Sequence, residues 1–258
     1  MSLPNKGIAV IERDALNQHL DLLLEVARFK DYGPNGLQVE GKASIRKVVS
    51  GVTASMDLIQ AAIAAQADAI VVHHGLFWRG QDGRLTGWMK KRVAALMAHD
   101  INLFAYHLPL DAHPSLGNNA QWGKRLGLAA DQRFGEQDLG FIGDAPENWD
   151  VGSLAQLIGQ TMGRNPTVVA GDGRPLKRIA WCSGGAQSYF EAAIAAGADV
   201  FLTGEISEPQ THYARETGVA FLACGHHASE RYGAQALGRR IAHDYALEHE
   251  FIDIDNPA

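Results

Sequence analysis

The sequence has only two cysteines, Cys182 and Cys224, among its 258 residues. Two thiols cannot build a disulfide framework, and neither cysteine stands in a CxxC pair that would hold a metal or a redox centre. Both are therefore expected to behave as small buried apolar residues. The chain must rely on an ordinary hydrophobic core, for which a content of 46% apolar residues is sufficient.

Long apolar runs and long basic runs are missing as well. No stretch approaches the roughly 18 apolar residues that a membrane helix needs, and residues 1–18 lack the apolar core of a signal peptide. These absences predict a cytoplasmic protein without a membrane partner. The formal net charge is −6 and the longest basic run covers residues 90–92, which argues against nucleic acid or an anionic membrane as a partner.

The common catalytic signatures are absent too. The sequence contains no GxSxG nucleophile elbow, no GxxxxGK[ST] phosphate loop and no GxGxxG dinucleotide loop. The segment CSGGAQS, residues 182–188, is a glycine-containing turn between a predicted strand and a predicted helix. Such a turn can bind an anion through its backbone N–H groups, or it can simply be a tight turn.

Helical and strand patterns alternate along the chain. Residues 12–29 carry apolar side chains at helical spacing, as do residues 55–66 and 87–99. Apolar runs of strand length follow the second and third of these segments, at residues 67–75 and 101–107. This rhythm predicts an α/β fold with largely parallel sheets covered by helices.

The rhythm also repeats. Residues 45–74 align without a gap to residues 176–205, and both copies contain the pentapeptide AAIAA. The next strand of each half is followed by histidine, three residues and an acid. We therefore expect two related α/β lobes from an internal duplication, residues 1–129 and 130–258, with a C-terminal strand that can pack back on the first lobe.

Histidines and carboxylates gather where three predicted strands end, which in open α/β sheets is the edge that binds ligands. The candidate ligands are His73, His74, His107, Asp111, His226 and Glu230, with His113 and His227 as possible orienting groups. Imidazoles and carboxylates together suit Zn, Fe, Mn or Ni better than Ca or Mg. The set exceeds the needs of one tetrahedral ion and fits two ions that share a carboxylate. A hydrogen-bonded core histidine is the other reading of each position.

The remaining histidines have no such context. They are His19, His99, His212, His243 and His249. We expect all of them to be ordinary surface or helix-end residues.

Several segments resemble one known family. They are NGLQVEG, VVHHGLFW, HLPLDAHPSLGNNAQ, TGEISE, GHHASER and FIDIDNP. They resemble the dinuclear-metal-centre proteins labelled GTP cyclohydrolase I type 2 homologues, over nearly the whole chain. The resemblance implies a toroidal homo-hexamer with two divalent metal ions per subunit. It also implies that His74 and Asp111 bind one ion, that His73 and His226 bind the other, and that Glu230 bridges both.

The function predicted from these residues is metal-dependent hydrolysis of a small polar or nucleotide-like molecule. Two ions bridged by a carboxylate would lower the pKa of a shared water. Glu205, which occupies the place of His74 in the second repeat, or His107 would then transfer a proton to the leaving group. A non-catalytic metal-binding, metal-delivery or regulatory scaffold is the alternative. A ring around nucleic acid is the weakest reading, because no basic stripe is present.

Overall fold

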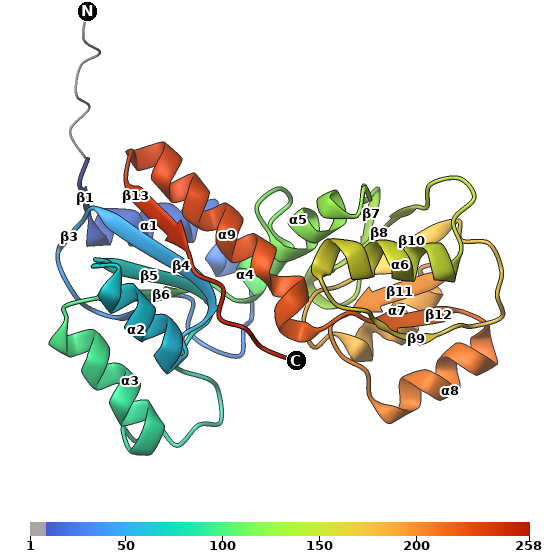
Figure 1. Cartoon of the computed structure of the whole chain (residues 1–258), viewed down its shortest axis with the longest axis horizontal. Helices are drawn as coiled ribbons and strands as arrows, with labels where there is room; N and C mark the ends of the chain where they lie inside the picture. Colours follow the sequence, from blue (N-terminus) through green and yellow to red (C-terminus); the bar gives the residue numbers. More distant parts are fainter. Residues whose placement is uncertain (1–8) are drawn as a thin grey trace, which may run out of the picture. The chain divides into compact units, whose positions relative to one another are not determined.

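The computed structural model describes residues 9–258, which form two compact units (Figure 1). Unit 1 contains the described residues up to Leu110 and residues 234–254, and unit 2 contains residues 111–233 and 255–258. The division falls earlier than the boundary at 129/130 expected from the sequence. Helix α9 (His226–Tyr245) starts in unit 2 and ends in unit 1. The C-terminal strand β13 (Glu248–Phe251), which follows this helix, pairs with β4 (Lys47–Thr53) and belongs to unit 1.

Unit 1 is built on a five-stranded sheet in the order β13-β4-β5-β6-β2. Four strands are parallel and β2 is an antiparallel edge. The strands are β2 (Gly36–Val39), β4 (Lys47–Thr53), β5 (Ala69–His74), β6 (Asn102–Ala105) and β13 (Glu248–Phe251), and a separate pair is β1 (Ile11–Glu12) with β3 (Ser44–Ile45). Helices cover both faces, as parallel strands with continuous apolar sequences require.

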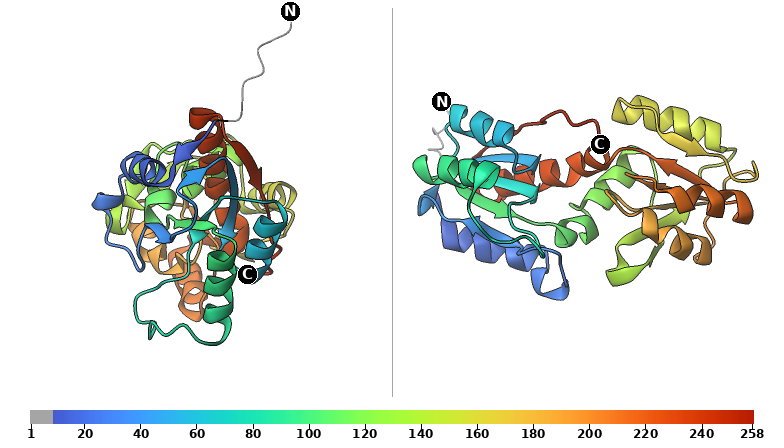
Figure 2. Two further views of the ribbon diagram at one scale, coloured as in Figure 1. Left: turned by 90° about the vertical axis from the view of Figure 1, so that its left-hand side faces the viewer. Right: turned by 90° about the horizontal axis from the view of Figure 1, so that it is seen from below.

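The helices of unit 1 are α1 (Arg13–Leu23), α2 (Met56–Ala64) and α3 (Gly87–Ala98), followed by the second part of α9. In Figures 1 and 2, α2 and α3 lie on one face of the sheet and α1 and α9 on the other. Helix α2 starts where the side chain of Ser55 accepts a hydrogen bond from the N–H of Leu58. A short 3-10 helix, η1 (Val26–Arg28), follows α1 inside the predicted helix 12–29.

Unit 2 is built on a six-stranded sheet in the order β7-β8-β10-β11-β12-β9, with β10, β11 and β12 parallel to one another. The strands are β7 (Gln132–Phe134), β8 (Gly140–Asp144), β9 (Thr167–Val169), β10 (Arg178–Trp181), β11 (Val200–Thr203) and β12 (Ala220–Ala223). The helices are α4 (Leu108–Ala112, shared with unit 1), α5 (Asn118–Arg125), α6 (Val151–Met162), α7 (Phe190–Ala195) and α8 (Glu208–Thr217), with 3-10 helices η2 (Glu136–Asp138) and η3 (Gln187–Tyr189). The largely parallel α/β class is confirmed.

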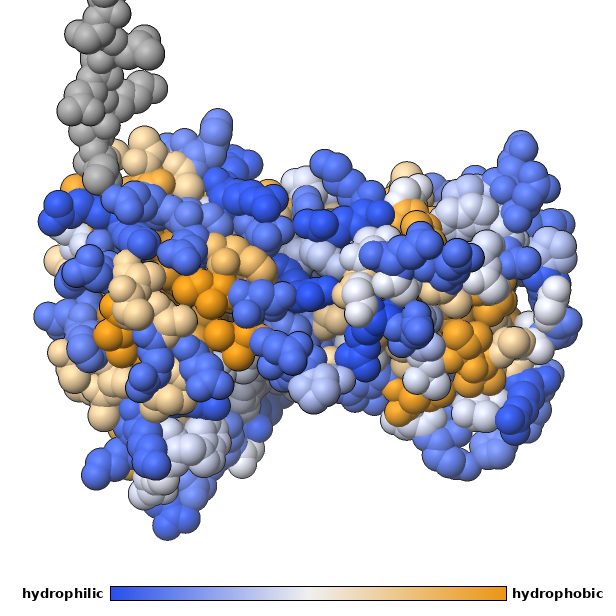
Figure 3. Space-filling model, viewed as in Figure 1, coloured by the Kyte–Doolittle hydropathy of each residue, from blue (hydrophilic) through white to orange (hydrophobic). Residues whose placement is uncertain are grey.

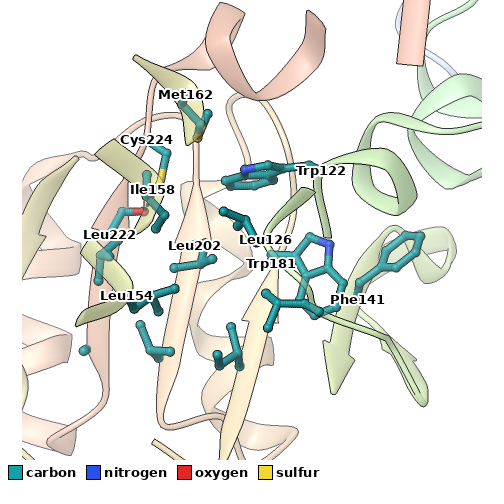
Figure 4. Close-up of a cluster of buried hydrophobic side chains, with 14 of the residues drawn as sticks. Trp122, Leu126, Phe141, Leu154, Ile158, Met162, Trp181, Leu202, Leu222 and Cys224 are labelled. Atoms are coloured by element: carbon teal, nitrogen blue, oxygen red, sulfur yellow. Dashed lines mark hydrogen bonds between the residues drawn. The ribbon is translucent and has the colours of Figure 1, made fainter. Parts of the chain in front are cut away.

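One core of unit 2 packs α5 and α6 on the sheet. Trp122 and Trp181 are buried there beside Phe141 (Figure 4). Gly123 allows this approach, because a Cβ at that position would lie 2.7 Å from the Trp181 ring. Both cysteines are buried, as expected, and burial raises the pKa of each thiol.

The two sheets share one hydrogen-bond arrangement at aligned positions of the repeat. The Asp68 carboxylate accepts from the backbone N–H groups of residues 46–47 at 2.9 and 3.1 Å. The Asp199 carboxylate accepts from those of residues 177–178 at 2.8 and 2.9 Å. Each aspartate thus ties the start of one parallel strand to the start of the next, which supports the internal duplication.

Hydrophilic and apolar residues are interspersed over the visible face of each unit (Figure 3). Within residues 9–258, no helix combines the length and the apolar character that crossing a membrane would demand.

His249 on β13 departs from the expectation of an ordinary surface residue. Its ring is half-buried, and Nε2 lies 2.9 Å from the Ser50 hydroxyl. Gly238 of α9 leaves room for the ring, because a Cβ there would overlap Nε2. Burial and the positive charge of Arg239 lower the pKa of His249 from 6.5 to about 4, against an opposing effect of Glu250.

Lowering the pH should therefore lower the free energy of unfolding, because the unfolded state binds a proton at His249 more readily than the native state does. The neutral ring stabilises the native state above the unfolded pKa of 6.5, and this contribution is lost as the pH falls through about 4. We expect a loss of about 1 to 2 kcal/mol, less than the full shift implies, because solvent screens the half-buried ring. Urea unfolding of wild type and His249→Gln across this pH range measures it. Equal pH dependence in the two proteins would contradict the assignment.

Candidate metal centre

The ends of β5 and β6 bring three histidines together in unit 1. His73 and His74 are the last residues of β5, and His107 follows β6. One ligand atom from each ring lies within 4.8 Å of the other two. The strands are parallel neighbours, so their carboxyl ends share one edge of the sheet. His107, expected from the sequence as a proton-transfer group or weaker ligand, belongs to this group of three.

The adjacent rings of His73 and His74 reach the same region although their Cβ atoms leave the strand on opposite faces. Their ring centroids are 4.6 Å apart. His73 Nδ1 lies 3.0 Å from the carbonyl oxygen of Tyr106, and His74 Nδ1 lies 3.2 Å from Thr53 Oγ1. A carbonyl only accepts, so His73 donates through Nδ1, which leaves Nε2 as the nitrogen that could hold an ion. Holding one ring nitrogen is how proteins orient imidazole ligands.

Asp31 holds His107 in the same way. Its Oδ1 lies 2.7 Å from His107 Nδ1, and its Oδ2 accepts from Asn35 Nδ2 and the N–H of Leu108 at 2.8 and 2.9 Å. Burial alone would raise the pKa of Asp31, but the hydrogen bond and charge of His107, together with the other donors, lower it. Asp31 was not predicted from the sequence, where it is only one polar residue in a glycine- and proline-containing loop.

A cavity of about 10 Å³ lies beside His73 and His107 and is also lined by Gln38 and Trp78. The Trp78 ring meets the His107 ring edge-on at 5.0 Å. A cavity of this size has room for about one water molecule. The imidazole group thus has a small enclosed space next to it.

In unit 2, His226 lies between two carboxylates. Glu230 is one turn further along α9, with its Oε2 3.2 Å from His226 Nε2, and its side chain is 3% exposed. Glu205, in the loop after β11, places Oε1 2.6 Å from His226 Nδ1. Burial would lower the pKa of His226, but the two carboxylates raise it to about 9. The two carboxylates make the surroundings of the ring negative, which favours a positive charge there.

Glu205 therefore contacts a candidate ligand and orients it. Its second oxygen lies 3.2 Å from Gln187 Nε2, which fixes the carboxylate from the other side. Glu205 was predicted as a proton-transfer group because it is aligned with His74, and that catalytic role stays a prediction. The contact of Gln187 was not predicted.

Asp111 is buried in unit 2, with 7% of its surface exposed. Its Oδ1 accepts hydrogen bonds from Asn118 Nδ2 at 2.9 Å and from Ser183 Oγ at 3.1 Å. Ser183 belongs to the glycine-containing turn 182–188. Gly184 of the same turn has φ +69°, and a Cβ on it would overlap Glu230 Oε1. The turn thus supports two carboxylates rather than presenting itself as an open anion site.

His113 and His227 take local roles. His113 Nδ1 accepts hydrogen bonds from the N–H groups of Ser115 and Leu116. The N–H of His227 donates to the carbonyl of Ala258. In the described part of the chain, neither ring belongs to a group of converging ligand atoms.

Comparison with known proteins places this chain in a family. The sequence profile described as Duf34/NIF3 (NGG1p interacting factor 3) matches residues 11–257. The chain belongs to the DUF34/NIF3 family. A relative from Neisseria meningitidis serogroup B, named GTP cyclohydrolase 1 type 2 homolog, is 52% identical over 235 residues, covering 91% of this chain and 94% of the relative. The resemblance read from the sequence motifs is confirmed.

Two solved structures share this fold over their whole length. The structure named "protein ybgI, unknown function" has a TM-score of 0.91 at 43% identity, covering 96% of this chain and 100% of that one. The protein TTHA1606 from Thermus thermophilus has a TM-score of 0.85 at 32% identity, with the same coverage. The DUF34/NIF3 fold is thus present from end to end, and the ligand groups described above are features of this chain within it.

Proposed function

We propose that this DUF34/NIF3 member is a dinuclear metal protein and a metal-dependent hydrolase. The observation that carries the proposal is the group His73, His74 and His107, whose ligand atoms lie within 4.8 Å of one another. Bringing together a buried His73 and the partly buried His74 and His107 is costly for packing alone, because each ring needs its own polar partners. Oriented imidazoles such as His73 and His74 are common donors to Zn and other borderline metals, and His107 beside them is left for proton transfer.

The donor chemistry supports two ions rather than one. Unit 1 offers only imidazoles, whereas unit 2 offers two buried carboxylates, Asp111 and Glu230, together with His226. Neither set alone supplies the four or more donors that each of two ions needs. Following the family resemblance, we propose that His74 and Asp111 bind one ion. His73 and His226 then bind the other, and Glu230 bridges both.

The residues around these ligands give the proposed reaction its proton path. Bound divalent ions would supply Lewis acidity, which polarises a scissile bond and lowers the pKa of water. His107 can take or give a proton at Nε2 while Asp31 holds Nδ1. In carboxylate–histidine pairs the carboxylate orients the ring in this way and the ring transfers the proton. Glu205 keeps His226 oriented, and its exposed surface allows proton exchange with solvent. The relatives' names include GTP cyclohydrolase, so a nucleotide-like substrate is part of the proposal.

We further propose a homo-hexamer located in the cytoplasm, with small molecules rather than nucleic acid as its partners. The net charge of −6 supports the exclusion of nucleic acid. Sedimentation equilibrium tests the assembly, and a monomeric or dimeric mass at micromolar concentration would refute it.

Elemental analysis combined with a hydrolysis screen tests the function. Wild type is loaded in turn with Zn, Fe, Mn and Ni, and is then assayed on nucleotides and small esters with and without a chelator. We expect two ions per chain and turnover that the chelator abolishes. One ion or none per chain would refute the dinuclear centre. Two ions without turnover would support the non-catalytic metal-binding or metal-delivery alternative.

A further inference from the structure

Two adjacent asparagines at the start of α5 are completely buried. Asn118 and Asn119 are each 0% exposed, although asparagine is mostly exposed in proteins. A buried amide costs free energy unless its N–H and C=O groups are hydrogen-bonded. Both residues lie in unit 2. If packing were the only requirement here, apolar side chains of the same size would suffice, so the hydrogen-bond partners of the two amides indicate what they do.

Asn118 joins the Asp111 carboxylate to α9. Its Nδ2 donates to Asp111 Oδ1 at 2.9 Å, and its Oδ1 accepts from the backbone N–H of Gly233 at 2.8 Å. A backbone N–H can only donate, so Oδ1 must face Gly233 and Nδ2 must face Asp111. Gly233 lies on α9 three residues after Glu230, and a Cβ on it would overlap Asn118 Oδ1. The amide is thus held directly against the helix that carries Glu230.

Asn119 holds the same ligand from its backbone side. Its Nδ2 donates to the carbonyl oxygens of Leu139 and Asp111 at 3.1 and 3.3 Å. Its Oδ1 accepts from the backbone N–H of Ser183 at 2.7 Å. Ser183 in turn donates through Oγ to the Asp111 carboxylate. The two asparagines therefore fix both the main chain and the carboxylate of Asp111.

We propose that Asn118 is a positioning residue of the metal centre, which sets the place of Asp111 relative to Glu230. This role rests on the proposed function, since that function assigns both carboxylates to metal ions. The bond from Asn118 to α9 spans 115 residues of sequence and makes one helix the reference for two anionic ligands. Groups that orient metal ligands typically contribute about 10- to 100-fold to metal affinity.

Co²⁺ binding by Asn118→Leu tests this role. Leucine is close to asparagine in shape but can neither donate nor accept a hydrogen bond. Wild type and variant are titrated with Co²⁺ in competition with a chromophoric chelator, and the visible absorption bands of bound Co²⁺ are recorded. We expect the affinity to fall about 10- to 100-fold. The bands should also shift, because the geometry of the ligands around the ion changes. A purely structural role of Asn118 would leave the bands unchanged.

Asn102→Leu is the matched control. Asn102 is also 0% exposed, and its amide makes the same kinds of bond. Its Oδ1 accepts from the N–H of Gly41, and its Nδ2 donates to the carbonyl oxygens of Lys42 and Asp68. It lies at the start of β6, whereas His107 follows the end of that strand. Urea unfolding should show a loss of stability in both variants, but only Asn118→Leu should lose Co²⁺ affinity.

Gly233→Ala is a second variant, which keeps the Asn118 amide and displaces it. Alanine suits a helix better than glycine does, so α9 itself is not weakened. We expect Co²⁺ affinity to fall about tenfold, and this variant decides the question if Asn118→Leu does not fold. Unchanged affinity and bands in the variants, or an equal loss of affinity in Asn102→Leu, would overturn the role of Asn118 alone. A wild type that binds no Co²⁺ would refute the proposed metal centre, and this role with it.

Discussion

Replacing Glu230 by alanine is expected to remove most of the metal-binding capacity of the chain. The carboxylate is 3% exposed and lies 3.2 Å from His226. As the proposed bridge it contacts both ions, so we expect metal content to fall from two ions per chain to one or none. The affinity for any remaining ion should drop about 100-fold or more, since an anionic ligand is lost. Elemental analysis and competition with a chromophoric chelator measure both quantities.

A second readout of Glu230→Ala does not require metal. Glu230 and Glu205 together raise the pKa of His226. The Glu230→Ala variant should therefore show a lower pKa of His226 than wild type in an NMR titration of protein from which a chelator has removed metal. Glu208→Ala is a matched control, because Glu208 is also paired with a histidine four residues on, His212, at 2.8 Å but on the surface. Full metal content in Glu230→Ala, or equal loss in Glu208→Ala, would contradict the assigned centre.

Gly184→Ala should damage the same site without removing any ligand. Gly184 adopts φ +69°, and a Cβ there would overlap Glu230 Oε1 and lie 3.1 Å from its Cδ and 3.3 Å from His226 Nε2. We expect a loss of about 3 kcal/mol in the free energy of unfolding. About 1 to 2 kcal/mol of this comes from the left-handed backbone and the rest from displacing a buried carboxylate. Metal affinity should fall as well.

Gly197→Ala separates the two causes. Gly197 also has a positive φ, +85°, but no atom lies within 4 Å of a Cβ built on it. This variant should lose only the backbone contribution, about 1 to 2 kcal/mol, and bind metal as wild type does. Urea unfolding and metal titration compare the two substitutions. If Gly184→Ala behaved like Gly197→Ala in both measurements, the close contact with Glu230 would have no energetic role.

The alternation of helical and strand patterns predicted most of the fold, because the spacing of apolar residues depends directly on the secondary structure. The apolar runs 67–75 and 101–107 became β5 and β6, and parallel neighbours must end at one edge. That geometry alone made the meeting of His73, His74 and His107 predictable. The i, i+4 spacing of His226 and Glu230 similarly placed them on one face once the segment was helical.

The groups that orient these ligands were not predictable in the same way. Asp31 reaches His107 across 76 residues of sequence, and Ser183 reaches Asp111 across 72. Loop side chains follow no period, and their partners are decided by how the loops fold onto the sheet. His249 was also missed, because its environment depends on β13 joining the sheet of unit 1 beside β4.

The paired tethers of Asp68 and Asp199 suggest what the duplication made possible. Both halves keep the same carboxylate-to-backbone link, while the ends of their second strands carry His73–His74 in one half and Gly204–Glu205 in the other. In a symmetric dimer of two identical half-length chains, both strands would end in the same side chains. A single polypeptide that contains both halves can carry different side chains at the two positions. The second strand of one half can therefore end in two imidazoles and that of the other in a glycine and a carboxylate, while both halves keep the link that starts the sheet.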